Sequence, residues 1–330
     1  MRYVLLLLCL CLAHPALAEP TLCHGNDLAA KMQAEDPKTY ADAEAEARAI
    51  PNGEAIFWKI EKQGIEPSYL LGSAHVTDPR VTDMPPGAEE KLASASVVAL
   101  ELAELVDKQK MAAAIFGNAI LMVQPPGQSL WDMIPDQDEA LIRDNPNLPP
   151  HAGGSLYGYQ PWVVAAMLAV PLCETQRKAD GLLVLDEKIG AAAAANHIQV
   201  VGLETVTEQL TVLASMAKED QVKYLIATAK LGAKASDYLE TMISLYMQRR
   251  ITLYMPFAEH AQAMTEDDRK IMAYVDEELI RKRNHRMAER AGPLIDKGNA
   301  FIAVGALHLP GKEGLVALLR QAGYKVTPLN

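Results

Sequence analysis

Beyond its first residues, the 330-residue chain lacks any apolar run long enough to cross a membrane. A spanning helix needs about 20 mostly apolar residues, and the continuous run at residues 4–12 is too short. That run follows Arg2 and precedes Ala16-Leu17-Ala18, which has the small-x-small pattern of a signal-peptide cleavage site. We therefore expect residues 1–18 to be a cleaved signal peptide, which makes the mature protein periplasmic or secreted, with no membrane span.

Cysteine is also scarce, with four residues in the whole chain. Cys9 and Cys11 lie within the predicted signal peptide, and because each follows a leucine we do not interpret either as a lipid-anchored cysteine. The mature chain then keeps Cys23 and Cys173, which in an exported protein can form one disulfide. The sequence gives no distance between them, so the paired and the unpaired states both stay open.

Positive charge is in deficit, with 31 Lys and Arg residues against 42 Asp and Glu residues and a formal net charge of −11. Removal of Arg2 with the signal peptide brings the mature chain to about −12, which is −11 minus one. A strongly acidic protein repels phosphate backbones. We therefore expect no nucleic-acid partner.

Several familiar catalytic motifs are absent. The chain has no His-Glu-x-x-His helix, no Gly-x-Ser-x-Gly elbow and no Gly-x-Gly-x-x-Gly fingerprint. Residues 305–312 end in Gly-Lys, but this run is one residue too long for a phosphate-binding loop, and Glu313 follows it. The chemistry must therefore come from another pattern.

That pattern occurs twice, in residues 68–75 and 301–308. Each copy is a short apolar run followed by Gly-x-x-His, and the copies end at His75 and His308. An apolar run that ends at glycine is typical of a buried strand leaving a sheet, and α/β proteins place their chemistry just past such ends. Two copies predict two strand ends directed at one site. The alternative is a pair of loop histidines with local hydrogen bonds.

Glu101 ends another apolar run, residues 97–100. Partial burial there raises the pKa of a carboxyl group unless a metal ion or an arginine compensates. With His75 and His308, Glu101 would form a three-ligand site with an open position for water, which can hydrolyse a carbonyl. The alternative is an acid that merely begins the following turn. Glu204 ends a similar run, and we interpret it as structural.

A basic cluster occupies residues 281–286 on a predicted helix. Most such clusters form a solvated helix face. An arginine near a metal site can nevertheless bind a substrate carboxylate or stabilise an oxyanion. We therefore take Arg283 and Asn284 as candidate catalytic residues that position substrate.

Strand and helix patterns alternate along much of the chain. They predict strands at 55–60, 69–71, 97–100, 200–204 and 324–326 besides the second histidine strand, and helices that include 37–49, 87–95, 105–123 and 266–291. This order predicts an α/β fold with a central mixed or mostly parallel sheet, built from two related halves, and a helix-rich middle insertion. After the signal peptide we expect a helical extension over 19–50 and one domain over 51–330.

Taken together, the motifs resemble those of the TraB/GumN family, part of the wider Tiki-like group. The resemblance covers roughly residues 50–328. Ser73 and Ala74 stand where threonine and then an apolar residue are commoner in that family, but these are the variable positions of the motif. The matching segments are Tyr69-Leu-Leu-Gly-Ser-Ala-His75, Ala99-Leu-Glu101, Leu185-Asp186, Val201-Gly-Leu-Glu-Thr205, Arg283-Asn284 with Met287, Val304-Gly-Ala-Leu-His-Leu-Pro-Gly311 and Gly323-Tyr324.

The resemblance implies an α/β fold in which both Gly-x-x-His motifs meet a glutamate, and a metal-dependent protease that uses manganese or cobalt. Imidazole ligands also suit zinc. We expect a divalent metal on His75, His308 and Glu101, and a peptide or protein substrate. The alternative is a non-catalytic periplasmic protein that binds haem or metal through the same histidines, or an accessory factor in envelope or polysaccharide assembly. The sequence specifies no oligomeric state.

Overall fold

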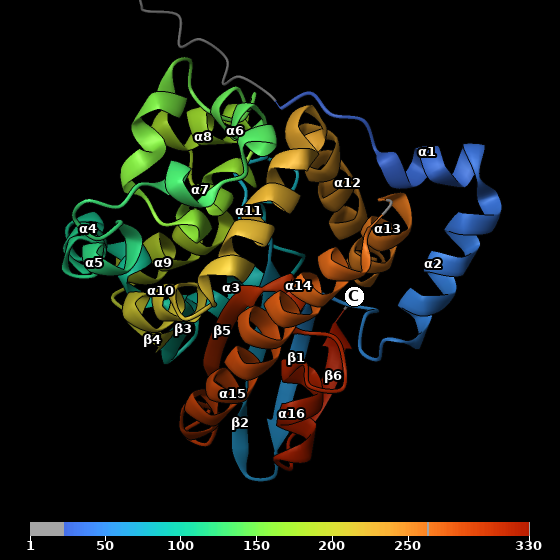
Figure 1. Cartoon of the computed structure of the whole chain (residues 1–330). Helices are drawn as coiled ribbons and strands as arrows, with labels where there is room; N and C mark the ends of the chain where they lie inside the picture. Colours follow the sequence, from blue (N-terminus) through green and yellow to red (C-terminus); the bar gives the residue numbers. More distant parts are fainter. Residues whose placement is uncertain (1–22, 263, 330) are drawn as a thin grey trace, which may run out of the picture.

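The computed structural model describes residues 23–262 and 264–329 (Figure 1). The predicted signal peptide and its cleavage site lie outside the described residues. Within the described part of the chain, no helix is both long enough and apolar enough to cross a bilayer.

A six-stranded mixed sheet forms the centre of the fold, in the order β4-β3-β5-β2-β1-β6. The four strands β4, β3, β5 and β2 run parallel to one another, whereas β1 is antiparallel to both β2 and β6. The predicted α/β class and the mostly parallel sheet are confirmed. The strands are β1 Phe57–Lys62, β2 Ile65–Ser73, β3 Val97–Leu102, β4 Gln199–Glu204, β5 Ala300–Gly305 and β6 Lys325–Leu329.

The two strands that carry the repeated histidine pattern are direct neighbours. β2 pairs in parallel with β5, with Gly72 opposite Val304 and Ser73 opposite Gly305. Because parallel strands end at the same edge of a sheet, both Gly-x-x-His segments leave the sheet side by side. The two related halves of the sequence therefore meet at its centre.

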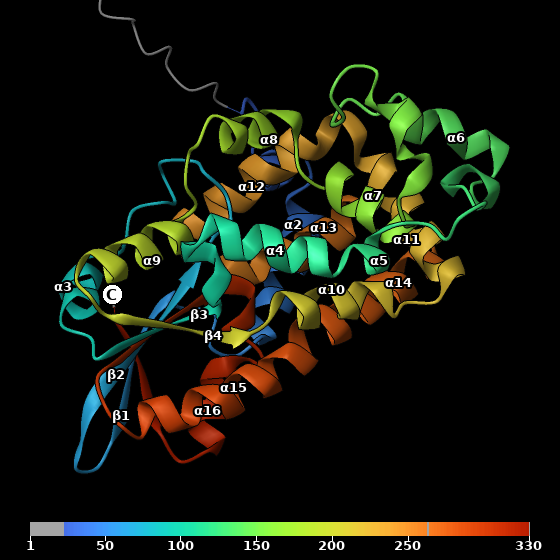
Figure 2. The ribbon, with the colours of Figure 1, turned by 90° about the vertical axis from the view of Figure 1, so that its left-hand side faces the viewer.

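Helices cover both faces of this sheet (Figure 2). On one face, α3 (Ala88–Ala93) and α9 (Leu185–Ala195) pack against alternate strand residues such as Val98 and Leu100. On the other face, α15 (Lys282–Ile295) and α16 (Leu315–Gln321) pack against the intervening residues such as Ala99. Side chains alternate along a strand with a period of two, so Glu101 continues the Ala99 series and points toward α15.

The remaining helices form a separate body beyond the carboxyl edge of the sheet, as the predicted insertion requires (Figures 1 and 2). One hydrophobic cluster among these helices contains Leu130, Leu168 and Leu225. They are α4 Lys108–Gly117, α5 Ala119–Met122, α6 Asp136–Arg143, α7 Pro161–Leu168, α8 Leu172–Ala179, α10 Val206–Ala214, α11 Lys218–Leu231, α12 Ala235–Met247, α13 Tyr254–Ala261 and α14 Glu266–Asp276.

Two predicted long helices are interrupted. The helix expected at 105–123 is wrong as a single element, because Asp107 ends the 3-10 turn η1 (Ala103–Val106) and its side chain caps α4. The helix expected at 266–291 is divided into α14 and α15 by a π-helical turn, η6 (Glu277–Arg281). A π-helical turn inserts extra residues without changing the apolar composition, so periodicity alone does not reveal it.

The N-terminal segment is tied to the insertion in two ways. The predicted helix at 37–49 is confirmed as α2 (Pro37–Ala49), and α1 (Leu28–Glu35) precedes it. Both pack against α12 and α13 through a cluster that includes Tyr40 and Phe257. Cys23 and Cys173 form a disulfide, which fixes this segment to α8 and resolves the state that the sequence left open.

Candidate active site

The predicted site residues lie together at the carboxyl edge of the parallel strands. His75 follows β2, Glu101 lies in β3, and His308 ends η7 (Ala306–His308), the turn after β5. Nε2 of His75 is 3.4 Å from Oε1 of Glu101, and Nε2 of His308 is 3.7 Å from the same oxygen. The two imidazoles therefore approach one carboxylate oxygen from two strand ends.

Each histidine has a fixed partner on its other ring nitrogen. Nδ1 of His75 lies 2.9 Å from Oδ2 of Asp186, which accepts a hydrogen bond from the protonated Nδ1. Nδ1 of His308 lies 2.7 Å from Oδ1 of Asn284, whose amide donates to the carbonyl of Glu313 at 2.9 Å. That second bond orients the Asn284 amide, so Nδ1 of His308 must be the donor. Such partners leave Nε2 free to bind a metal.

The Glu101 carboxylate accepts hydrogen bonds at both oxygens. Oε1 accepts from the backbone N–H of Gly305 at 2.7 Å, and Oε2 accepts from Arg283 at 2.6 Å. Burial raises the pKa of a carboxyl group, but His75, His308 and Arg283 hold the pKa of Glu101 well below its ordinary value. Glu101 is therefore ionised, which a metal ligand or a general base requires.

The two histidines titrate in opposite directions. Burial lowers the pKa of His308 to about 4, against the attraction of Glu101, and the His308 side chain is only 4% exposed. Burial also opposes the charge on His75, but Asp186 and Glu101 outweigh it and raise the pKa of His75. The His75 side chain is 52% exposed and reaches solvent. In the metal-free protein, His308 is neutral at pH 7, whereas His75 keeps its proton.

A buried ion-pair network positions Arg283. Its Nε donates to Glu204 at 2.8 Å, and Arg286 donates to the other oxygen of Glu204 at 2.9 Å. The Glu204 side chain is fully buried, so a paired arginine is needed to keep its charge inside the protein. Gln209 donates to both Glu204 and Glu101. Glu204 is therefore structural, as expected, and its contacts reach Glu101 through Arg283.

The loop that carries His75 is held by α8. The backbone N–H and the hydroxyl of Thr77 donate to the two oxygens of Glu174 at 2.7 and 2.8 Å. Arg177 donates to the hydroxyl and to the carbonyl of Thr77, both at 2.8 Å. Glu174 and Arg177 are both 1% exposed. Glu174 directly follows Cys173. These hydrogen bonds and the Cys23–Cys173 disulfide therefore join the N-terminal segment, α8 and the His75 loop.

Gly305 leaves the space at the centre of the site. A Cβ at this position would lie 2.8 Å from Nε2 of His75, 3.3 Å from Oε1 of Glu101 and 3.5 Å from Cδ2 of His308. The glycine of the second motif thus keeps open the point on which the three side chains converge. Gly72, the glycine of the first motif, instead allows close approach of the Ala306 backbone.

The donor set fits a divalent cation in chemistry. Two imidazole nitrogens and one carboxylate suit zinc or manganese, and both imidazoles have the hydrogen-bonded partners typical of metal ligands. Bonds of about 2.0–2.1 Å keep the ligand atoms of a tetrahedral ion roughly 3.3 Å apart, and the separations at Glu101 are close to that. Across the described residues, however, no group of three or more His, Cys, Asp or Glu side chains is arranged so that it could hold a metal ion.

A cleft of about 740 Å³ opens onto these residues. His75, Glu101, Arg283 and His308 line it together with apolar side chains that include Leu105, Leu183, Met242, Tyr246 and Ile280. An ionised acid and two imidazoles at the base of a largely apolar cleft can bind a polar reacting group and exclude water from the rest of the substrate.

The sequence predicted five of the polar groups, namely His75, Glu101, Arg283, Asn284 and His308, but not Asp186 as a partner of His75. Asp186 lies in the first turn of α9 and also accepts from the Ser73 hydroxyl at 2.8 Å. Leu185-Asp186 was among the segments that match the family, but that match assigned Asp186 no role, and its burial, at 1% exposure, is not visible in the sequence. The role of Asn284 in positioning substrate stays a prediction, since its amide contacts His308 and Glu313.

Comparison with known proteins gives a family match over most of the chain. The model of the TraB/PrgY/gumN family matches residues 56–328. The chain is similar to metalloprotease TIKI1 of Danio rerio (27% identical over 82% of this chain and 62% of that protein) and of Homo sapiens (25%, 82% and 61%). It is also similar to the metalloprotease TIKI homolog of Nematostella vectensis (22%, 83% and 67%). The chain thus spans about three fifths of the length of the first two relatives. No solved structure matches it significantly.

Proposed function

The chain belongs to the TraB/PrgY/gumN family, and on that premise we propose that it is an exported metal-dependent hydrolase that cleaves peptide bonds. Three relatives that match more than four fifths of the chain are named metalloproteases. These names support a divalent metal and a peptide or protein substrate. The observation that carries the proposal is the approach of His75 and His308 to the same oxygen of Glu101.

In this proposal His75, His308 and Glu101 hold the cation. When bound, a divalent cation lowers the pKa of water and polarises a carbonyl group. Asp186 and Asn284 keep the Nδ1 protons of the two imidazoles in place, so that Nε2 of each ring faces the centre of the site. The His75 proton and a cation compete for the same lone pair, so the cation binds more tightly as pH rises.

Arg283 has a separate role in the proposal. It neutralises Oε2 of Glu101 and lines the cleft, so it can stabilise negative charge that develops on a substrate carbonyl. Glu204 holds Arg283 in position. Glu101 keeps Oε1 for the cation or for a proton from the attacking water, since its other oxygen is bound to Arg283.

Metal analysis of the purified mature protein tests the proposal. We expect one equivalent of manganese, cobalt or zinc, and its loss in His75→Ala and His308→Ala. A fluorogenic peptide library, supplied with each cation in turn, should be cleaved by the native protein and not by Glu101→Gln. His260→Ala is the matched control, because that side chain bonds to Glu46 on α2, away from the site.

Two outcomes would contradict different parts of the proposal. If no divalent cation binds at stoichiometric loading and neither histidine variant changes binding, the metal centre is wrong. If the cation binds through both histidines but no peptide is cleaved, the protein is a metal binder, which was the alternative that the sequence left open.

A further inference from the structure

A second pocket of about 650 Å³ adjoins the cleft that contains Glu101. Four residues line both spaces: His75, Val76, Lys178 and Met242. The second pocket lies among α11, α12, α13 and α14, with the start of α8 on one side. A substrate that reaches His75 from the cleft can therefore extend directly into the second pocket.

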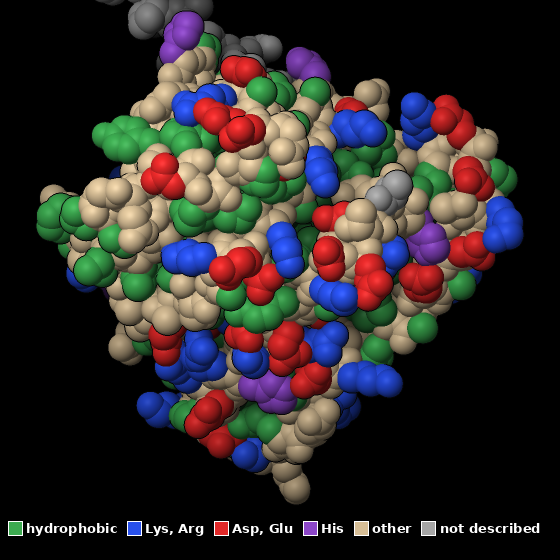
Figure 3. Space-filling view, in the orientation of Figure 1, with side chains coloured by type: hydrophobic (Ala, Val, Ile, Leu, Met, Phe, Trp, Pro, Cys, Tyr) green, Lys and Arg blue, Asp and Glu red, His purple; other side chains and the backbone are tan. Residues whose placement is uncertain are grey.

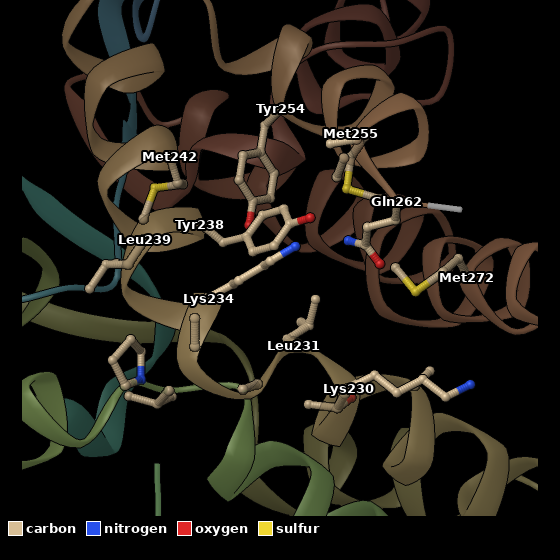
Figure 4. Close-up of a pocket in the computed structure, with 18 of the residues that line it drawn as sticks. Lys230, Leu231, Lys234, Tyr238, Leu239, Met242, Tyr254, Met255, Gln262 and Met272 are labelled. Atoms are coloured by element: carbon tan, nitrogen blue, oxygen red, sulfur yellow. The ribbon is translucent and has the colours of Figure 1, made fainter. Parts of the chain in front are cut away.

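The walls of this pocket are mostly apolar and adaptable. Figure 4 shows Leu231, Leu239, Tyr254 and Met272 directed toward the space. Four methionines line it in all: Met242, Met255, Met264 and Met272. Methionine is unbranched and fits apolar groups of varied shape. The lining therefore suits an extended apolar segment better than one rigid side chain.

One end of the pocket is polar and cationic. Lys234, Tyr238 and Gln262 point toward one another in Figure 4. Among the described residues, no ion pair or hydrogen bond of the Lys234 side chain is seen, and the Tyr238 hydroxyl lies beside the Gln262 amide (Figure 4). An ammonium group without an acidic partner, next to a phenol and an amide, provides the donors that bind a carboxylate.

The acids of the lining do not neutralise Lys234. Glu174 is engaged by Thr77, and Asp268 accepts from the backbone and hydroxyl of Thr265 at the start of α14. Glu259 is exposed. Lys234 lines the pocket but is itself exposed. Because the chain as a whole has a net charge of −11, an unpaired cation beside this apolar pocket is a local exception that selects for an anion.

The structure assigns this pocket as a specificity subsite that binds an apolar substrate segment carrying a carboxylate, with the carboxylate at Lys234 and the apolar part along Leu239 and Met242. This assignment rests on the proposed function for its link to cleavage. Ligand binding to the pocket can be measured independently of catalysis.

A pair of fluorescent dyes isolates the two features of the pocket. 1-Anilinonaphthalene-8-sulfonate is apolar and anionic, whereas N-phenyl-1-naphthylamine has the same rings without the charge. We expect Lys234→Met to weaken binding of the sulfonate by about tenfold, the effect of one charge-assisted contact, and to leave the neutral dye within about twofold. Leu239→Asp should weaken both dyes, since it places a charge against the apolar wall.

Two control variants make the dye experiment specific. Lys223→Met removes a lysine of α11, the helix that precedes Lys234, and Lys223 does not line the pocket. It should change the binding of neither dye. Phe116→Ser removes an 84% exposed apolar side chain of α4. Apolar groups gather on the surface there (Figure 3), so this variant measures how much dye binds outside the pocket. Equal sulfonate binding by the native protein and Lys234→Met, or an equal loss in Lys223→Met, would overturn the assignment.

Matched peptides separate this inference from the proposed function. One peptide carries leucines followed by glutamate, and its partner carries serines followed by glutamine. We expect Lys234→Met to raise KM for the first peptide about tenfold with kcat unchanged. If cleavage depends on Glu101 but KM is unchanged in Lys234→Met and Leu239→Asp, the subsite assignment is wrong. If both residues govern dye and peptide binding but nothing is cleaved, the subsite stands and the proposed hydrolase does not.

Discussion

The two motif glycines provide a test that separates the site from the fold. Gly305→Ala places a methyl group 2.8 Å from Nε2 of His75, the far end of a side chain that is half exposed. Gly72→Ala places the same methyl group 2.9 Å from Cα of Ala306, which is backbone. A half-exposed imidazole can swing away, whereas a buried backbone segment has no such freedom. The same chemical change is therefore expected to have different consequences in the two motifs.

The free energy of unfolding should distinguish the two variants. Gly305 has φ −55 and ψ 137, which alanine adopts without strain. Alanine also restricts the unfolded chain, which stabilises by about 0.4–1 kcal/mol. We therefore expect Gly305→Ala to stay within about 1 kcal/mol of the native protein, and Gly72→Ala to lose about 1–3 kcal/mol by overpacking. Urea unfolding followed by circular dichroism measures both.

Cation affinity should show the opposite order. Carbon contacts are optimal at about 3.5–4.0 Å, so His75 must retreat by roughly 1 Å from the new methyl group at Gly305. Metal–ligand distances tolerate only about 0.2 Å. We expect Gly305→Ala to bind Co²⁺ at least 10–100-fold more weakly, the loss typical when a metal ligand loses its orienting partner. Titration followed by the Co²⁺ absorption bands measures this affinity without any substrate.

Two results for Gly305→Ala would contradict these predictions. If Gly305→Ala binds Co²⁺ as the native protein does, the space in front of Gly305 is not the place where a cation sits. If Gly305→Ala unfolds as easily as Gly72→Ala, the displaced His75 ring is part of the packed fold and not a movable ligand.

Three further predictions concern the partners of these residues. Asn284→Leu removes the acceptor that orients His308 and should lower Co²⁺ affinity by about 10–100-fold; an unchanged titration would deny Asn284 that positioning role. Cys173→Ser removes the disulfide to Cys23 and should lower the free energy of unfolding by about 2–5 kcal/mol. An unchanged urea midpoint of the native protein after addition of reductant would contradict this prediction. In metal-free protein the pKa of His308 is lowered to about 4, so the unfolded chain binds that proton first and stability falls by up to about 3 kcal/mol between pH 6.5 and pH 4. The raised pKa of His75 affects stability only above that window, so His308→Gln should flatten the acid slope in urea titrations, and an unchanged slope would assign it to other groups.

The sequence was sufficient to bring His75, Glu101 and His308 to one edge of the sheet, because each follows a short apolar run. A strand that ends in glycine or at a carboxylate is a local signal, and parallel strands bring their ends together whatever lies between them in the chain. Arg283 was also predicted near the site. Its distance from Glu101, 182 residues along the chain, is bridged by the packing of α15 against the sheet.

Partners set by packing were beyond local reasoning. Asp186 contacts His75 because α9 packs on the face of the sheet over β3, β4 and β5. Leu185-Asp186 was one of the segments that match the family, but that match gave Asp186 no partner. The π-helical turn η6 interrupts the run between α14 and α15, yet Ile271 in α14 and Leu279 within η6 keep a helical spacing. Both features depend on contacts between segments far apart in the chain.

The two similar motifs build an asymmetric site. His75 is half exposed and bound to Asp186, which helps to raise its pKa, whereas His308 is buried and bound to the Asn284 amide, and its pKa is lowered. An acid partner stabilises the positive charge that a metal brings to an imidazole, and an amide partner fixes the ring without adding charge. In the proposed metal centre, His308 would therefore be the preformed ligand, and His75 would be the group at which a cation displaces a proton. Repetition of the Gly-x-x-His pattern places the two rings, and their different neighbours on α9 and α15 give them different tasks.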